Sequence, residues 1–208
     1  MNESIVQERI ITIKNLLDNN PTNSELLNDL GVGYYLIGNY ADSIESLSKA
    51  VELKPKNITY RYNLANSYSE LEEFSKAKYH YLIVLEESPE HIPSLNNLAD
   101  CYEAIGEKKR ALELFEYLTK IAPGNALAHF NYGNFLLRSG DHIQATKSYE
   151  MAIKIEPSFS DAYLNIAWIL FEVKAYQKSL EYLLNGLKED PEHEDLKKLL
   201  SKVRNHIR

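Results

Sequence analysis

Six prolines recur at a constant interval along the chain. Each lies 34 residues after the one before it, and only Pro93 falls outside the series. The six are Pro21, Pro55, Pro89, Pro123, Pro157 and Pro191. Because proline cannot donate the hydrogen bond that continues a helix, each one marks the end of a helical segment. A constant period of this length predicts a repeat protein, in which one small structural unit is copied along the chain.

Five repeats follow when this proline is set at the thirty-second place of each unit. They cover residues 24–57, 58–91, 92–125, 126–159 and 160–193. The eighth place is always small, and it holds Gly31, Ala65, Ala99, Gly133 and Ala167. The seventh, eighth and eleventh places share one stripe of a first helix, and the twentieth, twenty-fourth and twenty-seventh share one stripe of a second. Small residues let the two helices approach closely, while large ones fill the remaining space.

This order of small and large residues resembles the tetratricopeptide repeat (TPR) family. The resemblance covers residues 24–193, and the flanks match in part. It implies an all-α fold, a right-handed α-solenoid (superhelix) of antiparallel helix pairs whose first helices line a concave groove. Each pair buries only part of its apolar surface, so neighbouring repeats must stack. We therefore expect a single solenoid domain over residues 1–208.

The two ends of the chain are expected to differ from the full repeats. Residues 1–23 read as an N-terminal half repeat, in which residues 3–19 align with a second helix. Its apolar stripe consists of Val6, Ile10, Ile13, Leu16 and Leu17. Residues 194–208 read as a capping helix with Leu196, Leu199, Leu200, Val203 and Ile207 on one face and lysines on the other. A polar outer face is what a terminal cap needs.

Asparagine recurs at the sixth place, which the resemblance assigns to the groove. The four are Asn63, Asn97, Asn131 and Asn165. A carboxamide both donates and accepts, so it can pair with the C=O and N–H groups of a bound peptide. Neighbouring places supply further anchors, which are Tyr62, Asn66, Phe130, Asn134 and Trp168. Alternatively, the asparagines stabilise neighbouring helices, and the capping helix covers Trp168 with Leu196 and Leu199.

Charge restricts the class of partner. The chain carries a net charge of −7, which argues against nucleic acid and anionic membranes. Among the groove-facing places of the five repeats the only base is Arg138. Family members that grip the carboxylates of heat-shock chaperones use lysine and arginine there, so that ligand and phosphopeptides are disfavoured. A neutral to basic protein segment, bound in extended form, fits better.

The sequence contains no group of residues with the spacing of a catalytic or metal-binding site. The six histidines share no metal-ligand spacing, and Cys101 occupies a helix-packing place, so we expect no enzyme, no metal and no cofactor. No apolar run approaches the roughly 20 residues that a membrane-spanning helix needs. The start of the chain lacks the apolar segment of a secretory signal. With a single cysteine, these features favour a cytoplasmic protein.

We interpret the chain as a scaffold or adaptor that binds a peptide or partner protein in its groove. One alternative is a structural scaffold that oligomerises through its ends. Ile5 and Ile11 support it, because they occupy places that are mostly polar in the full repeats, at the end where no repeat precedes them. The other alternative is a non-catalytic accessory subunit of an enzyme complex.

Overall fold

The computed structural model describes residues 3–207 and contains twelve α-helices in that range, with no strand. Residues 1, 2 and 208, at the ends of the predicted half repeat and cap, lie outside the described part. The helices are α1 (Glu3–Asn19), α2 (Ser24–Leu36), α3 (Tyr40–Leu53), α4 (Ile58–Glu70), α5 (Phe74–Glu87), α6 (Ile92–Ala104), α7 (Lys108–Ile121), α8 (Ala126–Arg138), α9 (His142–Ile155), α10 (Ser160–Glu172), α11 (Tyr176–Glu189) and α12 (Glu194–Ile207). The first helix of every predicted repeat begins at the first residue of that repeat.

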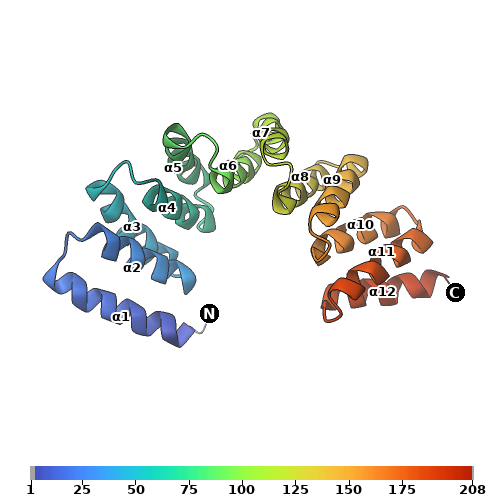
Figure 1. Cartoon of the computed structure of the whole chain (residues 1–208), viewed down its shortest axis with the longest axis horizontal. Helices are drawn as coiled ribbons and strands as arrows, with labels where there is room; N and C mark the ends of the chain where they lie inside the picture. Colours follow the sequence, from blue (N-terminus) through green and yellow to red (C-terminus); the bar gives the residue numbers. More distant parts are fainter. Residues whose placement is uncertain (1–2, 208) are drawn as a thin grey trace. The chain divides into compact units, whose positions relative to one another are not determined.

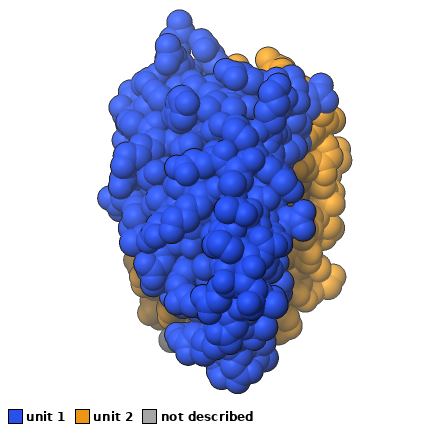
Figure 2. Space-filling model, turned by 90° about the vertical axis from the view of Figure 1, so that its left-hand side faces the viewer, with its two compact units in different colours: residues 1–114 blue, residues 115–208 orange. Residues whose placement is uncertain are grey.

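The chain contains two compact units, residues 1–114 and residues 115–208, and the boundary lies within α7 (Figure 2). We call them the N-terminal unit and the C-terminal unit. Within each unit, consecutive helices pack as antiparallel pairs (Figure 1). The first helices α2, α4 and α6 follow one side of the N-terminal unit, and α8, α10 and α12 follow one side of the C-terminal unit. This confirms the predicted all-α architecture of helix pairs.

A residue in the left-handed backbone conformation lies in the turn between the two helices of each repeat. The fifteenth place has a positive φ in all five repeats. Three of these residues are the glycines Gly38, Gly106 and Gly140, for which the conformation carries no steric cost. The other two, Glu72 (φ 57°) and Lys174 (φ 62°), adopt it with a side chain present. Repeat geometry therefore overrides local preference at these two turns.

Close contact between the paired helices explains the small residue at the eighth place. A Cβ atom on Gly31 would lie 2.5 Å from Leu47 Cγ, so no side chain fits there without movement. The Ser43 hydroxyl, which is fully buried, donates a hydrogen bond of 2.7 Å to the Gly31 carbonyl. Ser179 makes the same 2.7 Å bond to the Ala167 carbonyl. The serines at the twentieth place thus pack as small residues and also satisfy their own hydroxyls.

The terminal helices cover the ends of the two units. In α1, Val6, Ile10 and Ile13 are buried against α2, as the stripe predicts. Leu16 departs from the prediction, because its side chain is 49% exposed. It stands at the twenty-seventh place, which is buried in the full repeats beside their own first helix, and the described residues contain no such helix before α1. In α12 the side chains packed onto α10 and α11 are Leu196, Leu199, Leu200 and Val203.

Candidate functional site

The first helices carry every residue that the sequence assigned to peptide binding. We call their outward surface the first-helix face: α2, α4 and α6 in the N-terminal unit, and α8, α10 and α12 in the C-terminal unit. Each unit is considered by itself. The asparagines at the sixth place and the amides at the ninth are half-buried on this face. Half-burial leaves them partly available while their neighbours fix their orientation.

A closed hydrogen-bond triangle joins two successive repeats of the N-terminal unit. The buried Tyr81 donates its hydroxyl proton to Asn66 Oδ1 over 2.6 Å. Asn97 Nδ2, from the next first helix, donates to the same Oδ1 over 3.0 Å and to the Tyr81 hydroxyl over 3.2 Å. Burial raises the pKa of Tyr81, so its hydroxyl keeps its proton at neutral pH. The tyrosine, from the second helix, thereby orients both amides on the first-helix face.

The C-terminal unit repeats this arrangement at equivalent places. Tyr149 donates to Asn134 Oδ1 over 2.8 Å, and Asn165 Nδ2 donates to the same atom over 3.1 Å. Burial raises the pKa of Tyr149 to about 12. In both units the sixth-place asparagine therefore uses Nδ2 to join its helix to the preceding one. Asn63 does so too, donating to Asn28 Oδ1 over 2.9 Å. The structural role that the sequence left open for these asparagines is present.

A polar hollow of about 380 Å³ opens on the first-helix face of the N-terminal unit. Tyrosine rings and amides line it together with two carboxylates. The lining residues are Tyr35, Tyr62, Asn66, Ser69, Glu70, Tyr81, Asn97 and Asp100. Tyr35 donates a hydrogen bond of 3.0 Å to Glu70, and burial together with this carboxylate raises the pKa of Tyr35 to about 12. The hollow therefore presents negative charge beside aromatic surface, which suits a cationic or neutral ligand.

A second hollow, of about 520 Å³, lies on the first-helix face of the C-terminal unit. Its floor is apolar and includes Trp168, which is 42% exposed. Several basic side chains stand around it, two of them from the capping helix α12. The lining residues are Leu137, Arg138, His142, Leu164, Asn165, Trp168, Asp195, Lys198, Leu199 and Lys202. The cap therefore lies beside Trp168 without burying it, and the bases of α12 extend the first-helix face beyond the five repeats.

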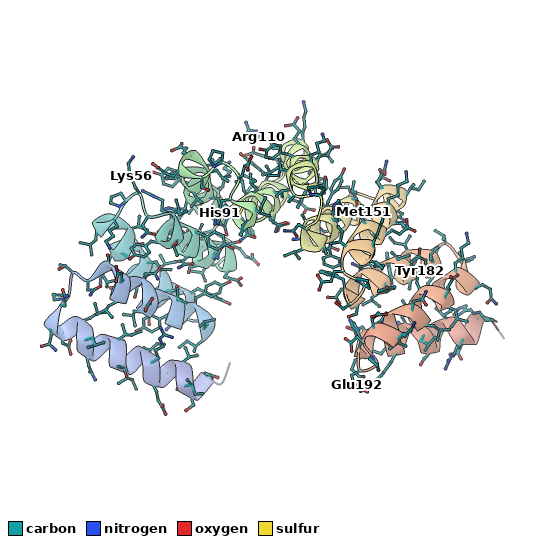
Figure 3. The ribbon with its side chains drawn as sticks, viewed as in Figure 1. Lys56, His91, Arg110, Met151, Tyr182 and Glu192 are labelled. Atoms are coloured by element: carbon teal, nitrogen blue, oxygen red, sulfur yellow. The ribbon has the colours of Figure 1, made fainter. Side chains whose placement is uncertain are left out.

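The remaining predicted aromatic anchors are packed against neighbours. Phe130 contacts Phe159 and Tyr149, with ring centroids 4.8 Å and 5.6 Å apart. Tyr62 packs edge-on against the ring of His91, with the ring centroids 5.2 Å apart. His91, which Figure 3 labels, is the N-cap of α6. The rings of Phe130 and Tyr62 are half-buried, so each offers one edge to a ligand rather than a freely projecting side chain.

Three family profiles match the sequence. The profile for the middle TPR-like domain of cilia and flagella-associated protein 70 matches residues 95–198, which is half of the chain. Two further TPR profiles match residues 31–72 and 62–126. The chain belongs to the tetratricopeptide repeat family. The resemblance inferred from the order of small and large residues is confirmed, and the family supports a general role in binding protein partners.

Solved TPR structures share the fold of this TPR chain. A TPR protein from Parabacteroides merdae superposes with a TM-score of 0.77 at 15% identity, over 97% of this chain and 79% of the other. One from Thermus thermophilus gives 0.68 at 18% identity, over 88% and 99%. YrrB, described as a TPR protein with an unusual peptide-binding site, gives 0.62 at 18% identity, over 93% and 97%. At these identities the likeness shows the α-solenoid fold alone. No curated protein matches the sequence significantly.

The structure groups some of the predicted site residues and leaves others apart. Tyr62, Asn66 and Asn97 line the polar hollow, and Asn165 and Trp168 line the apolar one. Asn131 is half-buried on α8. The outer isoleucines Ile5 and Ile11 are each 59% exposed on α1. Their proposed oligomer contact stays a prediction.

Sequence reasoning missed the two tyrosine hydroxyls, although the repeats carry a signal for them. Tyrosine stands at the twenty-fourth place in two repeats only, and these are the two with asparagine at the ninth place. The pairs are Tyr81 with Asn66 and Tyr149 with Asn134. In the other repeats the twenty-fourth place holds Leu47, Phe115 or Leu183. Because tyrosine at the twenty-fourth place occurs only together with asparagine at the ninth, the sequence itself indicates that these two side chains form a hydrogen bond.

The thiol of Cys101 fits a packing role. It is buried, and burial together with nearby Asp100 raises its pKa to about 12, so the reactive thiolate is disfavoured at neutral pH. Among the described residues, no cluster of three or more metal-binding side chains occurs. Within residues 3–207, no helix is both long enough and apolar enough to cross a membrane.

Proposed function

We propose that this TPR chain is an adaptor that binds a neutral to basic segment of a partner protein along its first-helix face. The observation that carries the proposal is the polar hollow of the N-terminal unit. Three tyrosine rings, an oriented amide pair and the carboxylates of Glu70 and Asp100 converge there. The peptide-binding site ascribed to YrrB, which shares the fold, is consistent with this use of a TPR surface.

The side-chain amides of Asn66 and Asn97 determine which hydrogen bonds a peptide backbone would form here. Asn97 Nδ2 is occupied by Asn66 and Tyr81, whereas Asn66 Nδ2 donates no hydrogen bond within the described part of the chain. Asn66 is therefore the donor to a peptide carbonyl, and Asn97 Oδ1 is the acceptor from a peptide N–H. A lysine or arginine of the same segment then lies near Glu70, where the attraction is charge-assisted. Asn131 and Asn165 extend the proposal along α8 and α10.

The test begins with capture of partners from the native host and mapping of the bound segment with overlapping peptides. Affinity of that segment is then measured by fluorescence polarisation. Glu70→Gln with Asp100→Asn removes two charges and keeps side-chain shape, so a loss of about tenfold or more is expected. Glu52→Gln with Glu86→Gln makes the same charge change on exposed second-helix positions and should leave affinity unchanged. Equal losses in both pairs would refute the proposed site.

Association through the N-terminal end is a second candidate, favoured by the exposure of Ile5 and Ile11. Arg9 limits its geometry. It occupies the twentieth place, which holds a fully buried serine or alanine in the full repeats, and it pairs with Asp29 over 3.5 Å. A second copy would therefore dock on the flanks of α1 rather than continue the stack. Sedimentation of wild type against Ile5→Lys, Ile11→Lys decides it: a wild type that stays monomeric well above micromolar concentration excludes the contact.

A further inference from the structure

The joint between α10 and α12 departs from the other joints on the first-helix face. Where the polar triangle occurs, a ninth-place asparagine receives hydrogen bonds from a tyrosine and from the next sixth-place asparagine. At the α10–α12 joint the same three places hold Trp168, Leu183 and Leu199. Leu199 and Leu183 are buried, while Trp168 keeps 42% of its surface exposed. All three polar members have become apolar, so this joint exposes an apolar surface instead of amides.

Basic side chains surround this apolar surface. Lys198 and Lys202 lie one turn apart on the same side of α12, and Arg138 approaches from the end of α8. Asp195 is the one carboxylate in the lining, and Lys198 is 2.9 Å from it. The two lysines of α12 therefore face a single carboxylate in the lining. In a chain with a net charge of −7, this local excess of positive charge is a departure from the rest of the surface.

We propose that this hollow, which we call the Trp168 hollow, binds an acidic segment of a partner protein that carries one aromatic or large aliphatic anchor. The anchor side chain packs on Trp168 and Leu199, and a neighbouring aspartate or glutamate lies between Lys198 and Lys202. The proposal rests on the proposed function of the first-helix face and adds the ligand chemistry of the C-terminal unit. That chemistry is opposite in charge to the ligand expected in the N-terminal unit.

Size and chemistry both favour this occupant. At about 520 Å³ the hollow is in the range of pockets that enclose a small ligand or a few side chains. An aromatic anchor gains both apolar burial and ring contact with the indole. A carboxylate gains charge-assisted hydrogen bonds from the lysines, whose flexible side chains reach over the rim. A basic segment would gain the apolar contact but would be repelled by Lys198 and Lys202, so charge favours the acidic segment over the basic one.

The position of the tryptophan provides the assay. Trp168 is the only tryptophan in the chain, so fluorescence excited at a wavelength that tyrosine does not absorb reports on this hollow alone. The probe is an acetylated, amidated pentapeptide with phenylalanine between two pairs of glutamates. We expect a saturable blue shift of Trp168 emission, with a dissociation constant of about 0.1–1 mM for so short a ligand. The same peptide with lysines in place of glutamates, or alanine in place of phenylalanine, should bind at least about tenfold more weakly.

Charge reversal of the rim tests the contact directly. Lys198→Glu with Lys202→Glu should weaken the acidic probe by about tenfold or more. Lys178→Glu with Lys188→Glu is the matched control, because it makes the same charge change at exposed positions of α11 and should leave affinity unchanged. Circular dichroism of both variants checks that the helices remain. In Trp168→Ala, whose readout is polarisation of a labelled probe, binding should be lost.

Each contrary outcome overturns the proposal. These are equal binding of the basic peptide, equal losses in the two charge-reversal pairs, and absence of a blue shift at millimolar probe. A blue shift that grows with protein concentration alone would assign the hollow to a second copy of the chain instead. Glu70→Gln with Asp100→Asn should leave the acidic probe unaffected. These experiments therefore distinguish a failure of the binding proposed at the polar hollow from a failure of the binding proposed at the Trp168 hollow.

Discussion

The buried hydroxyl of Tyr81 donates a 2.6 Å hydrogen bond to Oδ1 of Asn66, which joins the second helix α5 to the first-helix face. The same Oδ1 accepts from the next repeat. A core residue thereby fixes the position of an amide that faces a ligand. Stability of the stack and geometry of the binding surface consequently depend on the same atoms.

Removing this hydroxyl should weaken the fold measurably. Tyr81→Phe deletes the bond to Asn66 and the acceptor for Asn97, while the bond between the two amides remains. We expect the free energy of unfolding to fall by about 0.5–1.5 kcal/mol per lost bond. Urea unfolding followed by circular dichroism measures it. Tyr79→Phe is the control, because that ring is 60% exposed and should be nearly neutral. A similar loss in both variants would contradict the role of the triangle.

A methyl group on Gly133 should disturb the second triangle. The added Cβ would lie 2.6 Å from Tyr149 Cε1, and this ring is fully buried and bonded to Asn134. Gly133→Ala should therefore cost about 1–3 kcal/mol through overpacking. Gly124→Ala is the matched control, since nothing lies within 4 Å of a Cβ there. Thermal unfolding of the two variants should separate them, and a neutral Gly133→Ala would mean that the ring moves freely.

The left-handed turn at Lys174 offers a stabilising substitution. A residue with a side chain pays about 1–2 kcal/mol in this conformation. Glycine removes that cost but gains freedom in the unfolded chain, so Lys174→Gly should raise the free energy of unfolding by about 0.5–1 kcal/mol. The reciprocal change, Gly140→Ala, should lower it by a similar amount at an equivalent turn with φ 84°. Urea midpoints that shift in the same direction for both variants would refute this account.

Acid should destabilise the N-terminal unit through His80. Burial, together with the nearby charge of Arg61, lowers the pKa of His80 to about 4, and its ring stacks on Tyr68. The unfolded chain binds this proton near pH 6.5 and the folded chain only near pH 4. Stability is therefore complete above the unfolded value and is lost as pH falls from about 6.5 to 4. His80→Phe keeps an aromatic ring and should show a shallower loss between pH 7 and pH 5; an unchanged slope would disprove the contribution.

Much of this architecture could be predicted because the five repeats share one residue pattern, so the alignment of each repeat is checked against the other four. The 34-residue proline period alone places the start of every first helix, as Ser24 and Ile58 illustrate. The sequence left open whether the sixth-place asparagines bind a ligand or join neighbouring helices, because the partner of each amide depends on side-chain packing. Asn97 bonds to an amide that Tyr81 orients, whereas Asn63 bonds to Asn28. Leu16 was misplaced because its stripe was inferred from complete repeats, whereas the described residues contain no first helix paired with α1.

The capping helix shows why the Trp168 hollow escaped sequence reasoning. Lys198 and Lys202 were assigned to a solvated outer face, and the charge of the groove was counted over five repeats only. In the structure α12 begins 34 residues after α10 and packs beside it as the first helix of a further repeat would. Its lysines therefore lie beside Trp168. Whether a terminal helix ends a surface or extends it depends on which face its neighbours leave open, and that is a property of packing.

Photo-crosslinking tests the central claim, that the first-helix face holds the partner, most directly. Benzoylphenylalanine is introduced at Tyr62, which lines the polar hollow, and separately at Tyr79, an exposed ring on the second helix α5. Each protein is irradiated with the captured partner, and the crosslinked product is measured by mass spectrometry. The account predicts a crosslink from position 62 and none from position 79. A crosslink from position 79 alone would place the partner on the opposite surface and contradict the account.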